Sequence, residues 1–229
     1  MNTLEIYLHP DIGLCNRLWV VFSYYNYAKS TNKQIKIHWP ETICCPDHFL
    51  NFFEPLERIE FVSDVKINTY TTLWQEQFNP YETFIYQDLK LKGDIKNIIN
   101  KKINMHKNYN AIHVRTTRDF ITYLKTINKK PTTFNRFDLF LEKNSENQCY
   151  ISTDQVETQK YFTTKYNHVY FNSLLKEQNC DLDIQTRYSS IQDAVIDLFV
   201  CTKSKLFLGT PVSTFSDTII QLRKNKYNL

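Results

Sequence analysis

The second half of the chain alternates short apolar runs with segments of helical period, and this alternation limits the possible folds more than any other feature. Strands that are separated by helices form parallel sheets with right-handed crossovers. Strands are expected at residues 109–115, 149–152, 168–171 and 205–208, and helices at residues 135–142, 155–164, 190–202 and 213–224. The sequence therefore predicts an α/β unit of Rossmann-like type.

The first half shows the same alternation less regularly. Strands are expected at residues 4–8 and 34–39 and a helix at 16–30, with candidate strands at 58–62, 66–70 and 83–86 and a basic helix at 94–104. A boundary between residues 104 and 109 would divide the chain into domains of residues 1–106 and 107–229. The predicted fold class is α/β, with two small Rossmann-like halves that each contain a parallel sheet.

Composition and charge narrow the possible partners and locations. The 229 residues are 42% hydrophobic and 23% charged with a net charge of +4, which is ordinary for a globular protein. Short basic pairs such as Lys101-Lys102 indicate solvated surface, so no nucleic acid partner is expected. No apolar run is long enough for a transmembrane segment, and residues 1–5 do not resemble a signal peptide. We expect a cytoplasmic protein, in the host cytoplasm if the chain is viral.

The cysteines do not indicate a disulfide framework or a metal site. The six cysteines have no regular spacing, so reduced thiols are expected. Cys44-Cys45-Pro46-Asp47-His48 is the one cluster with metal-ligating residue types, and no second ligand pair accompanies it. No Asp-x-Asp, P-loop or G-x-G-x-x-G motif is present. No metal and no cofactor are therefore expected.

The first candidate motif is Gly13-Leu14-Cys15-Asn16-Arg17-Leu18, between the first expected strand and helix. Gly13 would permit a tight turn, and Asn16 could cap the helix so that its N-terminus faces a ligand. The alternative is a capped helix with no ligand.

The second motif is His113-Val114-Arg115, at the end of an apolar strand and followed by Asp119. Strand alternation places His113 and Arg115 on one face. A guanidinium can hold a diphosphate with a fork of donors, and a histidine can bond a base or a sugar. The alternative is a histidine satisfied by backbone and an arginine paired with Asp119.

The third motif joins Asp197, on a mainly apolar helix, to Ser213-Thr214 at the start of the last helix. A carboxylate can accept two hydrogen bonds from a guanine edge, and a helix N-terminus can receive a phosphate. The alternatives are a surface acid and a simple helix cap. Together with Arg115, the motif suggests a site for the diphosphate of a sugar nucleotide.

In their order, these motifs resemble the GDP-fucose-dependent fucosyltransferases of the α1,6- and protein O-fucosyltransferase superfamily, which includes the rhizobial nodulation enzymes. The resemblance extends to Ile151-Ser152-Thr153-Asp154, which is similar to the family's strand ending in Thr-Asp, and to Trp39 with residues 49–54. Residues 193–216 resemble the family's terminal peptide. The likeness covers most of the chain.

The resemblance implies a GT-B-like glycosyltransferase whose two parallel sheets face a cleft. Residues 1–106 would form the acceptor-side domain and residues 107–229 the nucleotide-sugar-binding domain. The enzyme would transfer fucose from GDP-fucose to a glycan or protein hydroxyl, with inversion and without a metal. The open alternatives are a glycosyltransferase for another sugar nucleotide and a catalytically inactive nucleotide-sugar-binding protein.

The resemblance also implies roles for individual residues. Arg115 would take the β-phosphate, and His113 and Asp197 would contact guanine. The expected catalytic residues are Arg115, Asp119 and Asn16, and the expected binding residues are Gly13, Asn16, Arg17, His113, Arg115, Asp154, Asp197, Ser213, Thr214 and Phe215. Asp119 is the candidate base, with Asp11 or Asp88 as replacements. Thr116 stands where many α1,6-type members have a second arginine, for which Arg118 could substitute.

Overall fold

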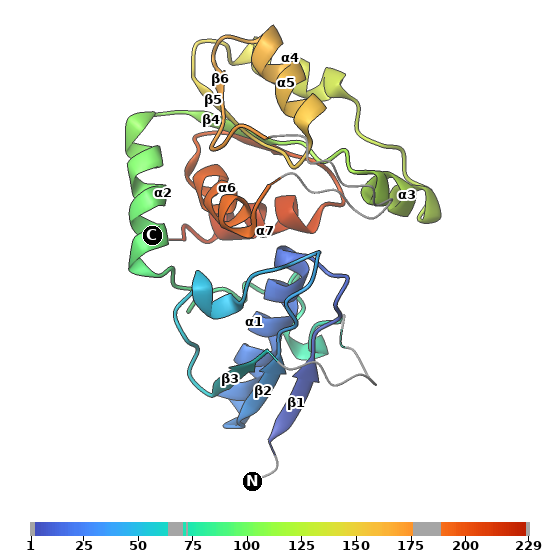
Figure 1. Cartoon of the computed structure of the whole chain (residues 1–229), viewed down its shortest axis with the longest axis vertical. Helices are drawn as coiled ribbons and strands as arrows, with labels where there is room; N and C mark the ends of the chain where they lie inside the picture. Colours follow the sequence, from blue (N-terminus) through green and yellow to red (C-terminus); the bar gives the residue numbers. More distant parts are fainter. Residues whose placement is uncertain (1–2, 64–70, 72, 176–188, 228–229) are drawn as a thin grey trace. The chain divides into compact units, whose positions relative to one another are not determined.

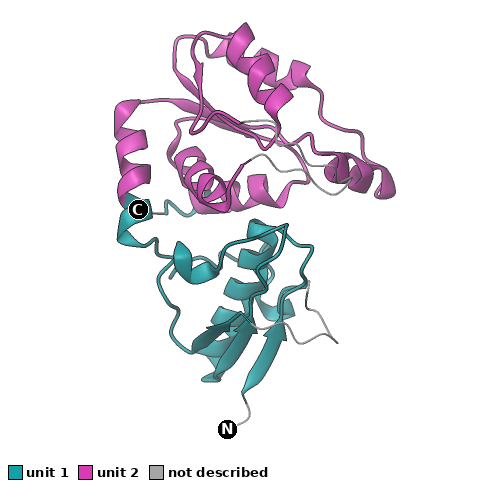
Figure 2. Ribbon diagram, in the orientation of Figure 1, with its two compact units in different colours: residues 1–96, 224–229 teal, residues 97–223 magenta. Residues whose placement is uncertain are grey.

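The computed structural model describes residues 3–63, 71, 73–175 and 189–227. It contains two compact units, residues 1–96 with 224–229 and residues 97–223 (Figure 2). Helix α2 (Gly93–Met105) runs across the division between them. The units therefore divide at residues 96–97, before this helix has ended, whereas the sequence suggested a boundary after it.

The first unit is built on a three-stranded parallel sheet in the order β1-β2-β3. Its elements are β1 (Leu4–Tyr7), α1 (Leu14–Thr31), β2 (Ile35–His38), the 3-10 turns η1 (Phe49–Asn51) and η2 (Glu76–Phe78), and β3 (Ile59–Val62). Apolar positions of α1 and alternate positions of the strands form its core, as at Leu18, Phe22, Ile37 and Trp39.

Two strand predictions in this unit have different outcomes. The strand expected at residues 58–62 is confirmed as β3, and the one expected at 66–70 lies outside the described residues. The strand expected at residues 83–86 is wrong. Ile85 and Tyr86 are buried, but the Ile85 carbonyl accepts a hydrogen bond from the Asn26 side chain at 2.8 Å in place of a neighbouring strand. Burial of an apolar pair therefore did not require a sheet.

The second unit confirms the strands and helices expected in the second half. Its four parallel strands lie in the order β6-β5-β4-β7 (Figure 1). Its elements after α2 are β4 (Asn110–His113), α3 (Arg118–Thr126), α4 (Phe134–Lys143), β5 (Cys149–Ser152), α5 (Val156–Lys165), β6 (Val169–Tyr170), α6 (Ile191–Lys203), β7 (Phe207–Gly209) and α7 (Thr214–Lys224).

Helices cover both faces of this second sheet (Figure 1). On one face, Ile112 and Ile151 pack with Phe137 of α4 and Phe162 of α5 in an apolar cluster that also contains Val114. The alternate strand positions, including His113 and Tyr150, contact α7 and α6 on the other face. The alternation of His113 and Val114 between faces is therefore as expected. It directs the histidine toward the last helix.

Helix α3 was not anticipated from the sequence. It begins at Arg118 and buries Phe120 and Leu124, which are four residues apart and so lie on one face. That spacing was the available signal. Its first turn contains Asp119, which places the carboxylate close to the end of β4. None of the described helices combines the length and apolar character that a bilayer crossing requires.

Candidate active site

The carboxyl ends of three neighbouring strands of the second unit lie at one level. His113 is paired in register with Ser152 of β5 on one side and with Gly209 of β7 on the other. In open parallel sheets, ligands bind outside this edge, where the loops and helix N-termini gather. The residues that follow β4, β5 and β7 therefore define the candidate site.

Thr210 joins the end of β4 to the turn after β7. Its hydroxyl donates to the backbone oxygen of His113 at 2.8 Å and accepts from the backbone nitrogen of Arg115 at 2.9 Å. Thr210 is buried, so both bonds are shielded from water. Sequence reasoning missed this residue, although its position directly after a strand end was a signal. It fixes the backbone that carries His113 and Arg115.

Arg115 is oriented by the first turn of α3. Its Nη2 donates to Asp119 Oδ2 at 3.1 Å, its Nε donates to Thr117 Oγ1 at 3.3 Å, and its guanidinium lies 4.9 Å from the centre of the Phe120 ring. The arginine–aspartate pair considered as the alternative reading is therefore present. The Arg115 side chain keeps 18% of its surface exposed. Its charge is held in place but is not enclosed.

His113 is buried against the first turn of α7. Its Nδ1 lies 2.7 Å from Ser216 Oγ, and its ring is 4.6 Å from the ring of Phe215, tilted by 33°. Burial and the nearby Arg115 charge lower the pKa of His113 to about 3, so the ring is neutral near pH 7. The partner of the ring is thus a side chain of the last helix, and not the backbone partner considered as the alternative.

The N-terminus of α7 presents an unusual hydroxyl. Ser213, just before the helix, is fully buried, and its Oγ has no hydrogen-bond partner among the described residues. The turn is also strained, because the preceding Val212 has a φ of 64°. This left-handed conformation is unfavourable for a β-branched residue, and such strain is concentrated at functional sites. The arrangement leaves a buried hydroxyl and free helix N–H groups next to each other.

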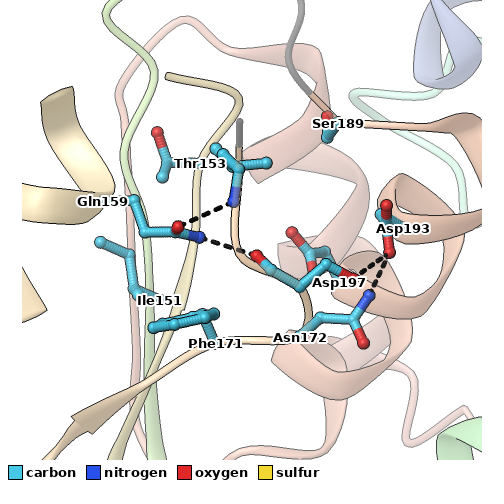
Figure 3. Close-up of a pocket in the computed structure, with 10 residues that line it drawn as sticks. Ile151, Thr153, Gln159, Phe171, Asn172, Ser189, Asp193 and Asp197 are labelled. Carbon is cyan, nitrogen blue, oxygen red and sulfur yellow. Dashed lines mark hydrogen bonds between the residues drawn. The ribbon is translucent and has the colours of Figure 1, made fainter. Parts of the chain in front are cut away.

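Asp197 is buried on α6, so the alternative of a surface acid is wrong. Its carboxylate accepts a hydrogen bond from the Tyr150 hydroxyl, and Ser152 is a second donor. Burial raises the pKa of Asp197 to about 7, against the lowering effect of these two donors. Asp197 lines a pocket with Thr153, which precedes Asp154 at the end of β5 (Figure 3).

Side-chain hydrogen bonds hold the outer wall of this pocket. Asp193 accepts from the Ser173 hydroxyl at 2.7 Å and from Asn172, and it also forms a capping box with Ser190 (Figure 3). Gln159 donates to the Ser173 carbonyl at 3.0 Å. Sequence reasoning missed Gln159 and Asn172. The capping-box spacing at the start of α6 was visible in the sequence, but its partners across the pocket were not.

The motif of the first unit differs from the expectation in two ways. Gly13 is the N-cap of α1 with φ −79° and ψ 177°, which any residue can adopt, so its backbone does not require a glycine. The helix begins at Leu14, so Asn16 lies inside its first turn and does not cap it. The capping role expected for Asn16 is wrong.

Arg17 serves the first unit itself. It is fully buried, donates to the carbonyls of Ile12 at 2.9 Å and Pro10 at 3.3 Å and to the Thr42 hydroxyl at 3.0 Å, and also reaches the Pro40 carbonyl. These bonds fasten the turn after β1 to the segment after β2. The donor-binding role expected for Arg17 stays a prediction that this geometry does not favour.

The candidate bases have different surroundings. Asp119 is paired with Arg115. Asp88 accepts from Lys29 at 2.6 Å and Tyr25 at 2.9 Å, and the Lys29 hydrogen bond contributes most to lowering its pKa, which weakens it as a base. Asp11 is largely exposed, and its backbone N–H bonds His9.

Among the residues described here, no group of three or more histidine, cysteine or acidic side chains is placed to hold a metal ion. Cys44 and Cys45 are buried free thiols.

A two-unit α/β chain with parallel sheets, and with an arginine and a helix N-terminus at the carboxyl edge of the second sheet, has the architecture of a GT-B-like glycosyltransferase. A profile described as GDP-fucose protein O-fucosyltransferase matches residues 15–226. The chain belongs to this family. It is therefore an enzyme of the fucosyltransferase class, as the motifs predicted.

Solved structures show the same fold at low sequence identity. The fucosyltransferase NodZ from Bradyrhizobium aligns with a TM-score of 0.60 and 14% identity over 96% of this chain and 93% of its own. A NodZ α1,6-fucosyltransferase crystal soaked with GDP-fucose gives the same values. POFUT1 in complex with GDP aligns with a TM-score of 0.62 and 14% identity over 97% of this chain and 95% of its own. No curated protein sequence gives a significant match.

Proposed function

We propose that this enzyme transfers fucose from GDP-fucose to a hydroxyl of a glycan or protein, with inversion and without a divalent metal. One observation carries the proposal: Arg115, the buried Ser213 hydroxyl and the N-terminus of α7 gather at the carboxyl edge of the second sheet. The family and the donors named for NodZ and POFUT1 are consistent with it.

The diphosphate would lie between Arg115 and the start of α7. Loss of GDP places negative charge on the leaving oxygens, and a fixed guanidinium with helix N–H groups stabilises that charge. Ser213 would donate its free hydroxyl to a phosphate oxygen, with Thr214 and Phe215 beside it. A cation and helix N–H groups supply the role that a metal has in other transferases, which is the reason for the metal-free proposal.

Asp197 and His113 would select guanine. A carboxylate matches the N1–H and amino group of guanine, whereas it repels the carbonyl edge of uracil. Tyr150 and Ser152 donate to Asp197 and so favour its charged form, although burial has the larger effect and raises the pKa to about 7. Asp154 would complete this side of the site.

In this proposal the acceptor binds to residues 1–106, where Asn16 would approach the sugar, and residues 107–229 bind the donor. Asp119 has two possible roles, since it can hold Arg115 or accept the proton of the attacking hydroxyl. We assign it mainly to the first role because its carboxylate is bonded to the guanidinium. Asp11 and Asp88 remain alternative bases.

A cytoplasmic location stays a proposal. Five of the six cysteines fall among the described residues, and all five are buried free thiols, which suits a reducing compartment. Fractionation of cells that express the protein would test it, and recovery in a secreted fraction would contradict it.

Calorimetry with GDP and UDP in the presence of EDTA tests the donor site, followed by assay of GDP-fucose transfer and hydrolysis. We expect GDP to bind without metal and UDP to bind more weakly. Tight and equal binding of both nucleotides would favour another sugar nucleotide. Tight GDP binding with neither transfer nor hydrolysis would favour a catalytically inactive binding protein. Binding that returns only with Mn²⁺ would overturn the metal-free proposal.

A further inference from the structure

Ser216 and His113 form a buried contact that the donor site proposed above does not use. Ser216 is in the first turn of α7, and its Oγ lies 2.7 Å from Nδ1 of His113 at the end of β4. The two residues are exposed by only 1% and 6%. Gly209 leaves room for this contact, because a Cβ on it would lie 2.6 Å from Ser216 Oγ. The ends of β4 and β7 and the first turn of α7 therefore together bring the Ser216 hydroxyl into contact with the His113 ring nitrogen.

The hydrogen positions follow from counting donors and acceptors. Within the described residues, His113 Nδ1 is the hydrogen-bond partner of the Ser216 hydroxyl. If Nδ1 carried a proton and donated it to Oγ, the hydroxyl hydrogen would be buried without an acceptor, which costs roughly 1–3 kcal/mol. If the hydroxyl donates to Nδ1, no buried donor is left unpaired. The second arrangement is therefore the more stable one.

The His113 imidazole cannot carry a proton on both nitrogens near neutral pH. A doubly protonated imidazole would need a hydrogen on Nδ1, where the hydroxyl hydrogen already points. Burial and the Arg115 charge also hold the pKa of His113 far below neutrality. The one remaining ring proton lies on Nε2, on a ring that packs against Phe215 in a tilted arrangement.

We propose that Ser216 is a positioning residue that fixes His113 as the neutral Nε2–H tautomer, so that the ring acts only as a hydrogen-bond donor toward the ligand. The identity of that ligand rests on the function proposed above, but the tautomer does not. The group facing Nε2 must then be an acceptor, such as a phosphate or sugar oxygen or an unprotonated base atom. An amino group at this place would be rejected.

Long-range ¹H–¹⁵N NMR of the nucleotide-free protein labelled at histidine tests the tautomer directly. Between pH 6 and 8 we expect the His113 Nδ1 resonance of an unprotonated nitrogen and the Nε2 resonance of a protonated one. A protonated Nδ1, or averaging between the tautomers, would overturn the inference. This measurement needs no variant and no nucleotide.

Ser216→Ala tests the cause. We expect the two His113 nitrogens to shift toward tautomer averaging and GDP binding to weaken roughly fivefold, the effect of one neutral hydrogen bond. Thr218→Val is the matched control, because the Thr218 hydroxyl is buried two residues further on α7 and donates to the Thr214 carbonyl at 2.8 Å. The control should leave the tautomer unchanged.

The outcomes separate this inference from the proposed function. An unchanged tautomer in folded Ser216→Ala would remove the role of Ser216 even if GDP binds normally. A fixed tautomer in a protein that does not bind GDP would overturn the proposed donor and leave the positioning role standing. If Ser216→Ala does not fold, Ser216→Cys applies the same test, since a thiol fills the site but is a weaker donor.

Discussion

Each unit carries an arginine a few residues after one of its strands, and the two arginines are used in opposite ways. Arg17, after β1, is fully buried and donates to three backbone carbonyls and a threonine hydroxyl. The side chain of Arg115, after β4, is partly exposed and donates to Thr117 and Asp119, both within four residues of it in the sequence.

The difference shows what separates a structural arginine from a ligand-binding one. A guanidinium has five N–H donors, and Arg17 directs its own at the backbone, where they hold two loops together. Within the described residues, the Nη1 of Arg115 has no hydrogen-bond partner. The hydroxyls follow the same rule, because Thr42 is bonded twice in the first unit and Ser213 Oγ is not bonded in the second. At the carboxyl edge of the second sheet, these unused polar groups distinguish Arg115 and Ser213 from Arg17 and Thr42, which residue type does not.

The largest expected effect is on transfer by Arg115→Ala. Loss of a donor that stabilises a developing charge lowers the rate about a hundredfold to a thousandfold. The melting temperature should change little, since within the described residues the Arg115 side chain donates only to Thr117 and Asp119 and its backbone bond to Thr210 is kept. Arg115→Lys should remain poor because a point charge cannot reproduce the planar fork. Near-normal transfer by folded Arg115→Ala would contradict the assignment of the site.

Arg17→Ala should lower the free energy of unfolding by about 2–3 kcal/mol, because the carbonyls of Ile12 and Pro40 lose the Arg17 donor and that of Pro10 keeps only Thr42. Urea denaturation measures this loss. GDP affinity of the remaining folded protein should be close to normal. A stable Arg17→Ala protein that fails to bind GDP would reverse the comparison between the two arginines.

Ser213→Ala should weaken GDP binding roughly fivefold and leave stability unchanged or slightly higher, because it removes a buried hydroxyl that has no partner in the protein. Thr42→Val is the matched change in the first unit. It should lower stability by about 1 kcal/mol and leave GDP binding unchanged, since the Thr42 hydroxyl bonds Pro10 and Arg17. Calorimetry measures the GDP affinity of both variants, and urea denaturation measures their free energies of unfolding. If Ser213→Ala and Thr42→Val changed GDP affinity and stability in the same way, the distinction between a ligand-binding and a structural hydroxyl would be lost.

The smallest expected effect is the net contribution of His113 and Asp197, in the second unit, to the pH dependence of stability. The pKa of His113 falls from 6.5 to about 3 on folding. Its contribution to the stability of the folded state is therefore fully present above pH 6.5 and is lost as the pH falls toward 3. The pKa of Asp197 rises from 3.8 to about 7, so it favours the folded state below pH 3.8 and loses that contribution as the pH rises through 7. Between pH 4 and 6.5 the two effects oppose each other.

Asp197→Asn separates the two effects. Relative to the unmodified protein, its stability should increase by about 1 kcal/mol or more between pH 5 and 7.5, because the cost of the buried charge is gone. Arg17→Ala should show no such trend, since a guanidinium does not titrate in this range. A constant stability difference between Asp197→Asn and the unmodified protein across this range would show that the Asp197 pKa is not raised.

The sequence by itself determined the order of most strands and helices, the parallel α/β class and the family. These depend on periodicity and on short motifs such as His113-Val114-Arg115, which are local properties of the chain. It is less informative at residues 83–86, where a buried apolar pair forms no strand, and at α3, where the four-residue spacing of Phe120 and Leu124 is the only local signal of a helix.

Only the tertiary structure decided how the polar residues of those motifs are used. The partners of Arg17 at Pro40 and Thr42 lie 23 and 25 residues away, and the Thr210 bond to His113 spans 97 residues. Such partners are set by how strands and helices pack, and no local pattern encodes them. A motif can therefore name an arginine or a serine as a candidate, whereas burial and hydrogen bonding decide whether it serves the fold or remains open to a ligand.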